Sequence, residues 1–465
     1  MKRSFLTPLL LVAAFPSCQF FEEEKPDLGR IYLEAANASA DTRRPVIVIP
    51  GIMGSKLETE AGTKVWGAFT RGAVDPDYPD GARTFALPMQ NGIPLSQLVD
   101  DVAATEVLDV LVADIGPLTG LDFAAYIGIL NVLNVGGFRD RSLGASGAID
   151  YGGLHYTCYQ FPYDWRRDIS ESAIELAKFV KESQDAVRAA RNLAPFAEVK
   201  IDVVAHSMGG LVLRYYLRYG AQPLPADGSL PELTWEGAKN VAHAIVVGTP
   251  SAGSALALEQ LTEGLNLHPL FPNYRPSVLG TFPSIYQLLP RTRHGAVIDQ
   301  NGEPVDIFQL QTWQRFGWGL ADPKVDKALA WLLPESDPSQ QTAIALKHLQ
   351  KCLARAEQLH RALDVPATPP IGTKLALFSG DALETVARWR VENDGDLVVD
   401  QTEPGDGTVT RASTLMDERQ GQIFTPGLQS PISWARVQFI FADHVGLTSS
   451  EEFTDNMLYM LLEEQ

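Results

Sequence analysis

The chain has few cysteines, less positive than negative charge, and no long apolar run beyond its N-terminus. Its 465 residues include three cysteines, too few for a disulfide framework. Cys158 and Cys352 could form one bridge in an oxidising compartment, but we expect two independent buried thiols. Lysine and arginine total 38 against 57 acidic residues, a net charge of −19, so the basic surface of a nucleic-acid-binding protein is missing. Without an apolar run of about 18 residues, we expect no internal membrane span.

The N-terminus has the layout of an export signal. Lys2 and Arg3 precede an apolar stretch over 5–15, which is too short for a membrane span. Cys18 and an acidic segment follow, as in bacterial lipoprotein signals, where such a cysteine becomes the lipidated first residue. Residues 15–17, Phe-Pro-Ser, depart from the usual small-residue pattern. A plain cleaved signal peptide therefore remains the alternative.

These features divide the chain into three parts. We expect a signal peptide over 1–18 with Cys18 as a possible lipidation site, an N-terminal tether over 19–44, and one domain over 45–465. The protein is then exported, as a periplasmic, outer-membrane or extracellular protein. A lipid anchor would also bring it to a membrane or another lipid surface.

Short runs rich in valine, isoleucine and leucine alternate with helical patterns. The apolar runs are 46–49, 199–205, 244–247 and 375–378. Near-continuous apolar strands suit a sheet that is buried on both faces. Helices are indicated after Asp168, over 208–219 before Gly220, and after Asp337-Pro338. The alternation predicts an α/β fold with a mostly parallel central sheet and helices on both faces.

Two stretches interrupt this alternation. Residues from about 75 to 150 contain loops and an amphipathic segment. Residues from about 251 to 370 contain the long helix that begins near Asp337. We interpret both as insertions over the central sheet.

The most informative motif is Ala205-His206-Ser207-Met208-Gly209-Gly210. A β-rich run precedes it and a helical pattern follows, which is the context of the nucleophile elbow of α/β hydrolases. Small residues at positions 205 and 209 allow the tight turn that exposes the serine Oγ. The motif predicts that Ser207 is a catalytic nucleophile in an α/β-hydrolase fold.

A nucleophilic serine needs a base and an acid, which follow it in this order along the chain: serine, acid, histidine. His444 is the only histidine in the last hundred residues and lies in a loop after a predicted strand. For the acid, Asp406 lies between two glycines that permit a turn toward the site. The neighbouring aspartates are the alternatives, namely Asp394, Asp396 and Asp400.

The negative charge of the transition state needs hydrogen-bond donors. We expect the backbone N–H groups of Met208, directly after the nucleophile, and of Ile52, in the loop over 50–55, to form the oxyanion hole. No cofactor-binding motif is present. His348 and Cys352 lie four residues apart on a predicted helix, but two ligands do not make a metal site.

Seven segments spread over most of the chain carry a family resemblance, namely 49–55 with Leu57-Glu58, 162–166, the Ser207 elbow, 248–250 with Gly253-Ser254, 283–284 with 288–290, 405–409 and the loop at His444. They resemble the lecithin:cholesterol acyltransferase family, which includes lysosomal phospholipase A2 and phospholipid:diacylglycerol acyltransferases. The resemblance implies a triad of Ser207, Asp406 and His444, and a cap and lid over a lipid-accepting cleft. The two disulfides of the animal enzymes are absent.

Aromatic residues are candidates for substrate contacts. Trp313, Phe316 and Trp318 cluster in the second insertion, and Trp165 lies in a segment that resembles the family. They could form an apolar wall for acyl chains or a lipid contact. The alternative is that the cluster in the insertion forms the small core of the cap.

The sequence therefore predicts a serine acyl hydrolase or O-acyltransferase that acts on lipid esters, as a phospholipase A or a lipid acyltransferase. An acyl-enzyme on Ser207 would pass its acyl group to water or to an alcohol. One alternative is a carboxylesterase or thioesterase of small acyl substrates. Another is a surface binding protein that keeps the hydrolase scaffold without turnover.

Overall fold

The computed structural model describes residues 25–70, 72–113, 121–124, 126–152, 155–267, 271–322, 326–419 and 425–464. The predicted signal peptide over 1–18 and its Cys18 lie outside the described residues. None of the helices in this described part combines the length and the apolar character that a membrane span needs.

A six-stranded parallel sheet forms the centre of the molecule, in the order β15-β12-β10-β9-β1-β8. The four apolar runs predicted as strands lie in β1, β9, β10 and β12, which confirms the predicted α/β architecture. The strand bounds are β1 Val46–Ile49, β8 Cys158–Gln160, β9 Ile201–His206, β10 Val241–Val247, β12 Lys374–Gly380 and β15 Arg436–Ile440.

Both faces of this sheet are covered, because successive side chains of a strand point to opposite sides. Along β1, Ile47 and Ile49 belong to one apolar cluster, whereas Val46 and Val48 belong to another. Helices α6 (Ile169–Ala190) and α7 (Met208–Tyr219) contribute to the first cluster. Helices α4 (Ile127–Val135) and α15 (Glu451–Leu462) contribute to the second, on the other face.

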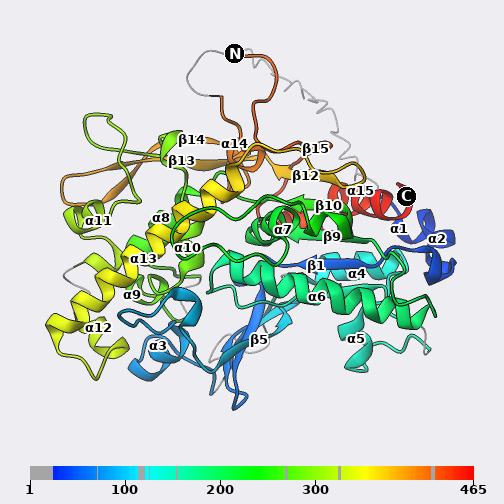
Figure 1. Ribbon diagram of the computed structural model, residues 1–465, viewed down its shortest axis with the longest axis horizontal. Helices are drawn as coiled ribbons and strands as arrows, with labels where there is room; N and C mark the ends of the chain where they lie inside the picture. Colours follow the sequence, from blue (N-terminus) through cyan, green and yellow to red (C-terminus); the bar gives the residue numbers. More distant parts are fainter. Residues whose placement is uncertain are drawn as a thin grey trace, which may run out of the picture.

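The stretch predicted as the first insertion, 75–150, does not form a separate layer. Its helix α4 packs against α15 and covers the central sheet. Two small sheets lie beside it, one antiparallel and one mixed (Figure 1). They consist of β2 (Ser55–Thr59), β3 (Lys64–Trp66) and β5 (Val102–Val107), and of β4 (Ala68–Phe69), β6 (Val110–Ala113) and β7 (Leu121–Ala124). The same stretch contains α3 (Pro79–Phe85) and α5 (Arg141–Ala145), and α5 contacts β8.

The second predicted insertion, 251–370, is mostly helical, and α13 (Pro338–Asp364) runs diagonally across it (Figure 1). Asp337 caps α13 as predicted, since its carboxylate accepts the N–H of Gln340 at 3.0 Å. The other elements here are α8 (Ala255–Glu263), α9 (Pro276–Leu279), α10 (Pro283–Gln287), β11 (Val297–Ile298), α11 (Leu310–Phe316) and α12 (Asp326–Leu332). A hairpin of β13 (Leu383–Val391) and β14 (Leu397–Gly405), followed by α14 (Arg411–Leu415), completes the fold.

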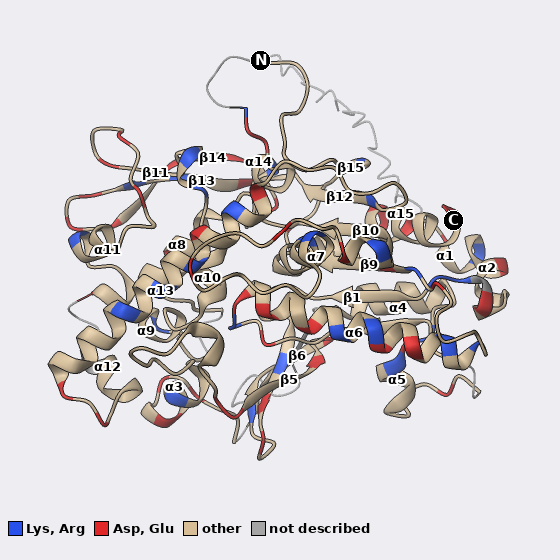
Figure 2. Cartoon of the chain, viewed as in Figure 1, with Lys and Arg blue, Asp and Glu red and all other residues tan. Residues whose placement is uncertain are grey.

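The described part of the predicted tether lies against the domain. Its helices α1 (Leu28–Ile31) and α2 (Leu33–Asn37) lie near the C-terminus (Figure 1). Tyr32 is buried, and its Oη donates to the Asp455 carboxylate of α15 at 3.1 Å. Charged residues of both signs occupy outer helices such as α6, while β1 carries none (Figure 2). Charge therefore lies mainly outside the apolar centre.

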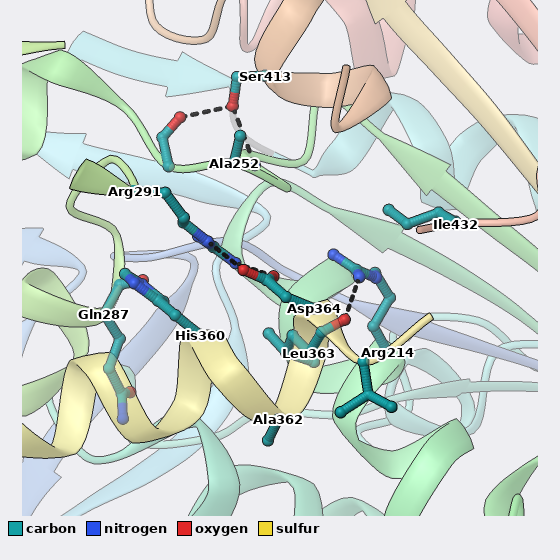
Figure 3. Close-up of polar contacts among 12 residues, drawn as sticks. Arg214, Ala252, Gln287, Arg291, His360, Ala362, Leu363, Asp364, Ser413 and Ile432 are labelled. Carbon is teal, nitrogen blue, oxygen red and sulfur yellow. Dashed lines mark hydrogen bonds and ion pairs between the residues drawn. The ribbon is translucent and has the colours of Figure 1, made fainter. Parts of the chain in front are cut away.

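The end of α13 meets α7 in a buried polar joint (Figure 3). Arg214 of α7 donates to the carbonyl of Leu363 at 3.1 Å, and Arg291 donates to the Asp364 carboxylate at 3.1 and 3.3 Å. His360 bonds the carbonyl of Gln287 at 2.9 Å. This joint, defined by Arg214, Arg291, His360, Leu363 and Asp364, fixes the long helix onto the central layer.

Candidate active site

The turn between β9 and α7 places Ser207 in a strained backbone conformation. Its φ is 53° and its ψ is −127°, a region that residues other than glycine rarely adopt. The N–H of Ser207 donates to Val247 O, and its carbonyl accepts from Thr249 Oγ1, both at 2.8 Å. A Cβ at Gly209 would lie 2.4 Å from Pro50 O, which explains the small residue at this position. The turn has the geometry of a nucleophile elbow.

Ser207, Asp406 and His444 meet at the carboxyl end of the parallel sheet. Ser207 Oγ lies 2.9 Å from His444 Nε2, and His444 Nδ1 lies 2.7 Å from Asp406 Oδ2. Both distances are those of hydrogen bonds. The structure thus brings together the three residues that were selected from distant parts of the sequence, in the order needed for proton transfer from the serine.

Asp406 is held as a carboxylate by its own loop. It is 1% exposed, and its Oδ1 accepts the N–H groups of Thr408 at 2.9 Å and of Val409 at 2.7 Å. Burial alone would raise the pKa of Asp406, but the hydrogen bond and charge interaction with His444, with these two N–H groups, lower it below its usual value. The ionised form can therefore orient His444.

The neighbouring aspartates have other environments. Asp400 forms ion pairs with Arg388 and Arg390 on the β13–β14 hairpin. Asp394 and Asp396 lie in the turn of that hairpin. Among these acidic residues, Asp406 is the one that contacts His444.

The loop expected to supply the second oxyanion donor lies against the nucleophile. A Cβ at Gly51 would be 2.7 Å from Ser207 Cβ, so only glycine permits this approach. Ile52 follows and lines the cavity in front of Ser207. Within the described chain, neither the N–H of Ile52 nor that of Met208 has a hydrogen-bond partner in the protein. Both donors are free for a substrate oxygen.

Three aromatic side chains donate hydrogen bonds to carbonyl oxygens of this loop. Tyr163 Oη donates to Pro50 O at 2.9 Å, Trp66 Nε1 to Met53 O at 2.7 Å, and Trp165 Nε1 to Ser55 O at 3.1 Å. Trp165 is completely buried. The predicted substrate contact of Trp165 therefore needs correction, because its indole supports the loop that contains Ile52 and is not among the residues that line the cavity in front of Ser207.

An apolar cavity of about 280 Å³ opens in front of Ser207 and His444. Cavities near this size accept small ligands or part of a larger one. Most of its wall is hydrocarbon, so an acyl chain would be desolvated there without the loss of hydrogen bonds. Apolar residues of the wall include Met53, Trp66, Leu108, Leu111, Leu256 and Leu288.

Trp313, Phe316 and Trp318 do not line this cavity, contrary to the prediction of an acyl-chain wall. All three are buried, and the indoles of Trp313 and Trp318 donate to the carbonyls of Ile307 and Gly395, both at 2.7 Å. Their rings contact one another, with centroids 4.9 and 5.8 Å apart. The three residues belong to the larger of the two apolar clusters, so they have a packing role, as in the alternative interpretation, but do not form a separate core.

Sequence reasoning missed two polar residues that contact the site. His206 precedes the nucleophile, and its ring lies 4.8 Å from that of His444. Tyr126 bonds His206 and lines the cavity. The position of His206 within the elbow motif was a usable signal, whereas Tyr126 comes from a segment that showed only amphipathic spacing.

Comparisons with known proteins bear on the family and the fold. The model of the lecithin:cholesterol acyltransferase family matches residues 155–314, which contain Ser207 but not Asp406 or His444. No curated protein sequence matches the chain.

Among solved structures, a chain of the Tle4–Tli4 complex shares 13% identity, covers 91% of this chain and 98% of its own length, and has a TM-score of 0.56. EstA from Clostridium botulinum (14% identity, 92% and 89% coverage) and lipase 1 from Pelosinus fermentans (15%, 90% and 99%) have TM-scores of 0.33 and 0.34. The first similarity supports the overall fold, whereas the other two scores are too low to support a conclusion.

The central parallel sheet, the helices on both its faces and the strand-to-helix turn at Ser207 give the chain the predicted α/β-hydrolase fold. The family match places residues 155–314 with the lecithin:cholesterol acyltransferase family, which confirms the resemblance and the prediction of an enzyme of this hydrolase and acyltransferase class.

Proposed function

We propose that the protein is a serine acyl hydrolase or O-acyltransferase of lipid esters, with a catalytic triad of Ser207, Asp406 and His444. One observation carries the proposal: the Ser207 Oγ, 2.9 Å from His444 Nε2, faces an apolar cavity of about 280 Å³. A nucleophile paired with a base, next to room for an acyl chain, suits attack on a long-chain ester.

The reaction would proceed through an acyl-enzyme. His444 Nε2 accepts the Ser207 proton while Oγ attacks the ester carbonyl carbon, and Asp406 stabilises the imidazolium that results. The tetrahedral intermediate collapses when His444 returns this proton to the leaving alkoxide, which departs as an alcohol. Water or a second alcohol then repeats the attack on the acyl-enzyme and releases a fatty acid or a new ester.

The negative oxygen of the tetrahedral intermediate would accept the N–H groups of Ile52 and Met208. One such donor is typically worth about 3 kcal/mol of transition-state stabilisation. The support of the Ile52 loop by Tyr163, Trp66 and Trp165 favours this role, since a fixed donor loses little free energy to reorganisation.

We propose further that the protein is exported and that Cys18 attaches it to a lipid surface, where its substrate is found. A substitution Cys18→Ser tests this part separately. The variant protein should move from the membrane fraction to the soluble fraction with unchanged activity on a water-soluble ester. Retention in the membrane fraction would reject a lipid anchor at Cys18.

The main experiment gives the purified protein a defined phosphatidylcholine, with and without a sterol or a long-chain alcohol. Free fatty acid and new ester are measured together, so the ratio separates hydrolase from acyltransferase. A series of p-nitrophenyl esters should show a preference for longer acyl chains. Ser207→Ala is the control, and if it keeps most of the wild-type rate, the assignment of the nucleophile is wrong.

A further inference from the structure

Two buried residues beside the nucleophile link the oxyanion loop to the general base. The N–H of Gly51 lies 2.7 Å from Tyr126 Oη, and Tyr126 Oη lies 2.8 Å from His206 Nδ1. His206 Nε2 lies 2.9 Å from the carbonyl oxygen of His444. The chain of bonds therefore starts at the loop before Ile52, passes the residue before Ser207, and ends on the peptide of the base.

The chemistry of the end groups fixes the two outer bonds. The N–H of Gly51 can only donate and the carbonyl of His444 can only accept, so Tyr126 Oη accepts from Gly51 and His206 donates from Nε2. Burial lowers the pKa of His206 and keeps the ring neutral. A neutral ring with its proton on Nε2 has an acceptor at Nδ1, so the Tyr126 hydroxyl donates to Nδ1 and one tautomer of His206 is defined.

We propose that Tyr126 and His206 are positioning residues for the acyl-transfer reaction, which fix Gly51 and the His444 peptide relative to each other and keep an uncharged ring beside the base. The inference rests on the proposed function of Ser207, Asp406 and His444. It assigns roles to two residues that line the cavity but do not accept the Ser207 proton.

The uncharged state matters because of the short distance between the two imidazoles. Their ring centroids lie 4.8 Å apart, and His444 becomes a cation when it takes the Ser207 proton. A second cation at His206 would oppose that proton transfer. Burial, with the nearby His444, lowers the pKa of His206 to about 3, so the ring stays neutral over the working range of the enzyme.

The position of Gly51 matters because the next residue offers its N–H to the oxyanion. Gly51 lies so close to Ser207 that a Cβ there would be 2.7 Å from Ser207 Cβ. A rotation of this loop would therefore move the adjacent Ile52 N–H relative to Ser207. Tyr126 is 6% exposed and therefore bonds Gly51 in a nearly water-free environment, where a hydrogen bond is strong. Loss of Tyr126 Oη would leave the N–H of Gly51 and the Nδ1 of His206 without these partners.

The test compares Tyr126→Phe with a matched control. In Tyr219→Phe the same hydroxyl is removed from a buried tyrosine at the far end of α7, where Oη donates to Ala362 O at 2.7 Å. With an activated ester, Tyr126→Phe should lower kcat by about 10- to 100-fold and leave KM within about twofold, because donors that move by a fraction of an ångström stabilise the transition state less. Tyr219→Phe should retain the wild-type kcat.

Inhibitor affinities separate positioning from loss of structure. An alkyl boronic acid that forms a tetrahedral adduct on Ser207 should bind Tyr126→Phe more weakly by about the factor lost in kcat. An ether analogue of the ester, which cannot form the adduct, should bind as it does to the wild type. His206→Gln, whose amide can still reach His444 O, should keep at least about fivefold more kcat than His206→Leu. Melting temperatures of all variants are measured in parallel.

The inference is overturned if Tyr126→Phe keeps its kcat within twofold of the wild type, or if the boronic acid and the ether lose affinity equally. Ser207→Ala distinguishes this failure from failure of the proposed function. An active Ser207→Ala rejects the triad and the positioning roles together. An inactive Ser207→Ala beside an unchanged Tyr126→Phe rejects the positioning roles alone.

Discussion

The N-terminal end of α7 and the joint at Arg214 differ in how completely their polar side chains are paired. At the N-terminal end, both ring nitrogens of His206 and the hydroxyl of Tyr126 have partners. At the joint, Arg214 from the middle of α7 and Arg291 are buried, and each has one nitrogen, Nη1, without a partner in the described chain. Helix α7 therefore connects paired side chains beside Ser207 with a joint that buries surplus positive charge.

The difference suggests a separation between rate and stability that can be tested. In the joint, Asp364 is the carboxylate that faces Arg291, while among the described residues Arg214 donates only to the carbonyl of Leu363. Burial, with the nearby Arg218 and Arg291, lowers the pKa of Arg214 to about 9. We expect changes at the site to alter rate without altering stability, and changes at the joint to do the reverse.

The largest expected effect is that of Ser207→Ala on rate. Without the nucleophile, kcat should fall by about 10⁵- to 10⁶-fold, because members of a triad act as a unit. The urea midpoint should not decrease, since alanine fits the same buried turn. Steady-state kinetics and urea unfolding of one preparation test both statements.

Ser413→Ala is the matched control, because Ser413 is also a buried serine, and its Oγ donates to Gly253 O at 2.5 Å. In this variant kcat should stay at the wild-type value, and the free energy of unfolding should fall by about 1 kcal/mol.

Asp406→Asn should have the next largest effect. An amide at this position cannot stabilise the imidazolium and favours the wrong tautomer of His444, so kcat should fall by about 10³- to 10⁴-fold. Asp400→Asn removes a carboxylate that only pairs with Arg388 and Arg390 on the hairpin, so it should leave kcat unchanged. A loss of less than tenfold in Asp406→Asn would remove Asp406 from the triad.

At the joint, Asp364→Asn should lower stability and leave the rate nearly unchanged. The substitution removes the charge that faces Arg291 and Arg293 at 3.1 and 2.9 Å. The free energy of unfolding should fall by about 3 kcal/mol, because a buried cation loses its partner. Urea unfolding measures the loss, and kcat of the folded variant gives the comparison. A drop in kcat as large as that of Asp406→Asn would show that the joint and the site are not separate.

Acid should weaken the joint through His360. Burial, together with Arg291, lowers the pKa of His360 from 6.5 to about 3, so between these values the unfolded chain binds a proton that the folded chain excludes. Stability is therefore lost as the pH falls below 6.5, by about 2 kcal/mol from this residue at pH 5. His360→Gln should show a smaller difference between the urea midpoints at pH 7 and pH 5. An equal pH dependence in both proteins would contradict this account.

The smallest expected effect is the change in stability on substitution of Arg214, which differs from Arg291 in having no carboxylate partner among the described residues. Arg214→Met removes a buried cation that faces no carboxylate directly, so stability should change by about 1 kcal/mol or less, in the stabilising direction. Arg291→Met leaves Asp364 without its buried partner and should destabilise clearly. Thermal unfolding of the two variants tests whether Arg291→Met is less stable than Arg214→Met. An equal loss of stability in both would mean that the charge of Arg214 is compensated in the folded protein, contrary to this account.

Local patterns explain why much of the site could be predicted from the sequence. The elbow around Ser207 is a continuous motif, and the glycines beside Asp406 distinguish it from the aspartates before it. Contacts between distant segments could not be predicted in this way. Trp165 looked like a substrate contact because its segment resembles the family, but its indole bonds Ser55 O. Tyr126 reaches Gly51 from a stretch that was interpreted as an insertion, because its spacing gave no information about the strand it would meet.

The way the peptide of His444 is held has a consequence for protein engineering. Its N–H donates to Asp406 O at 2.9 Å, and its carbonyl accepts from His206 Nε2 at the same distance, so the peptide of His444 is held on both sides. The neighbouring Phe441 and Val445 are 85% and 51% exposed. Neither side chain takes part in these two hydrogen bonds. Both can therefore be exchanged to change how the protein surface beside the site contacts a substrate, while the position of His444 is kept.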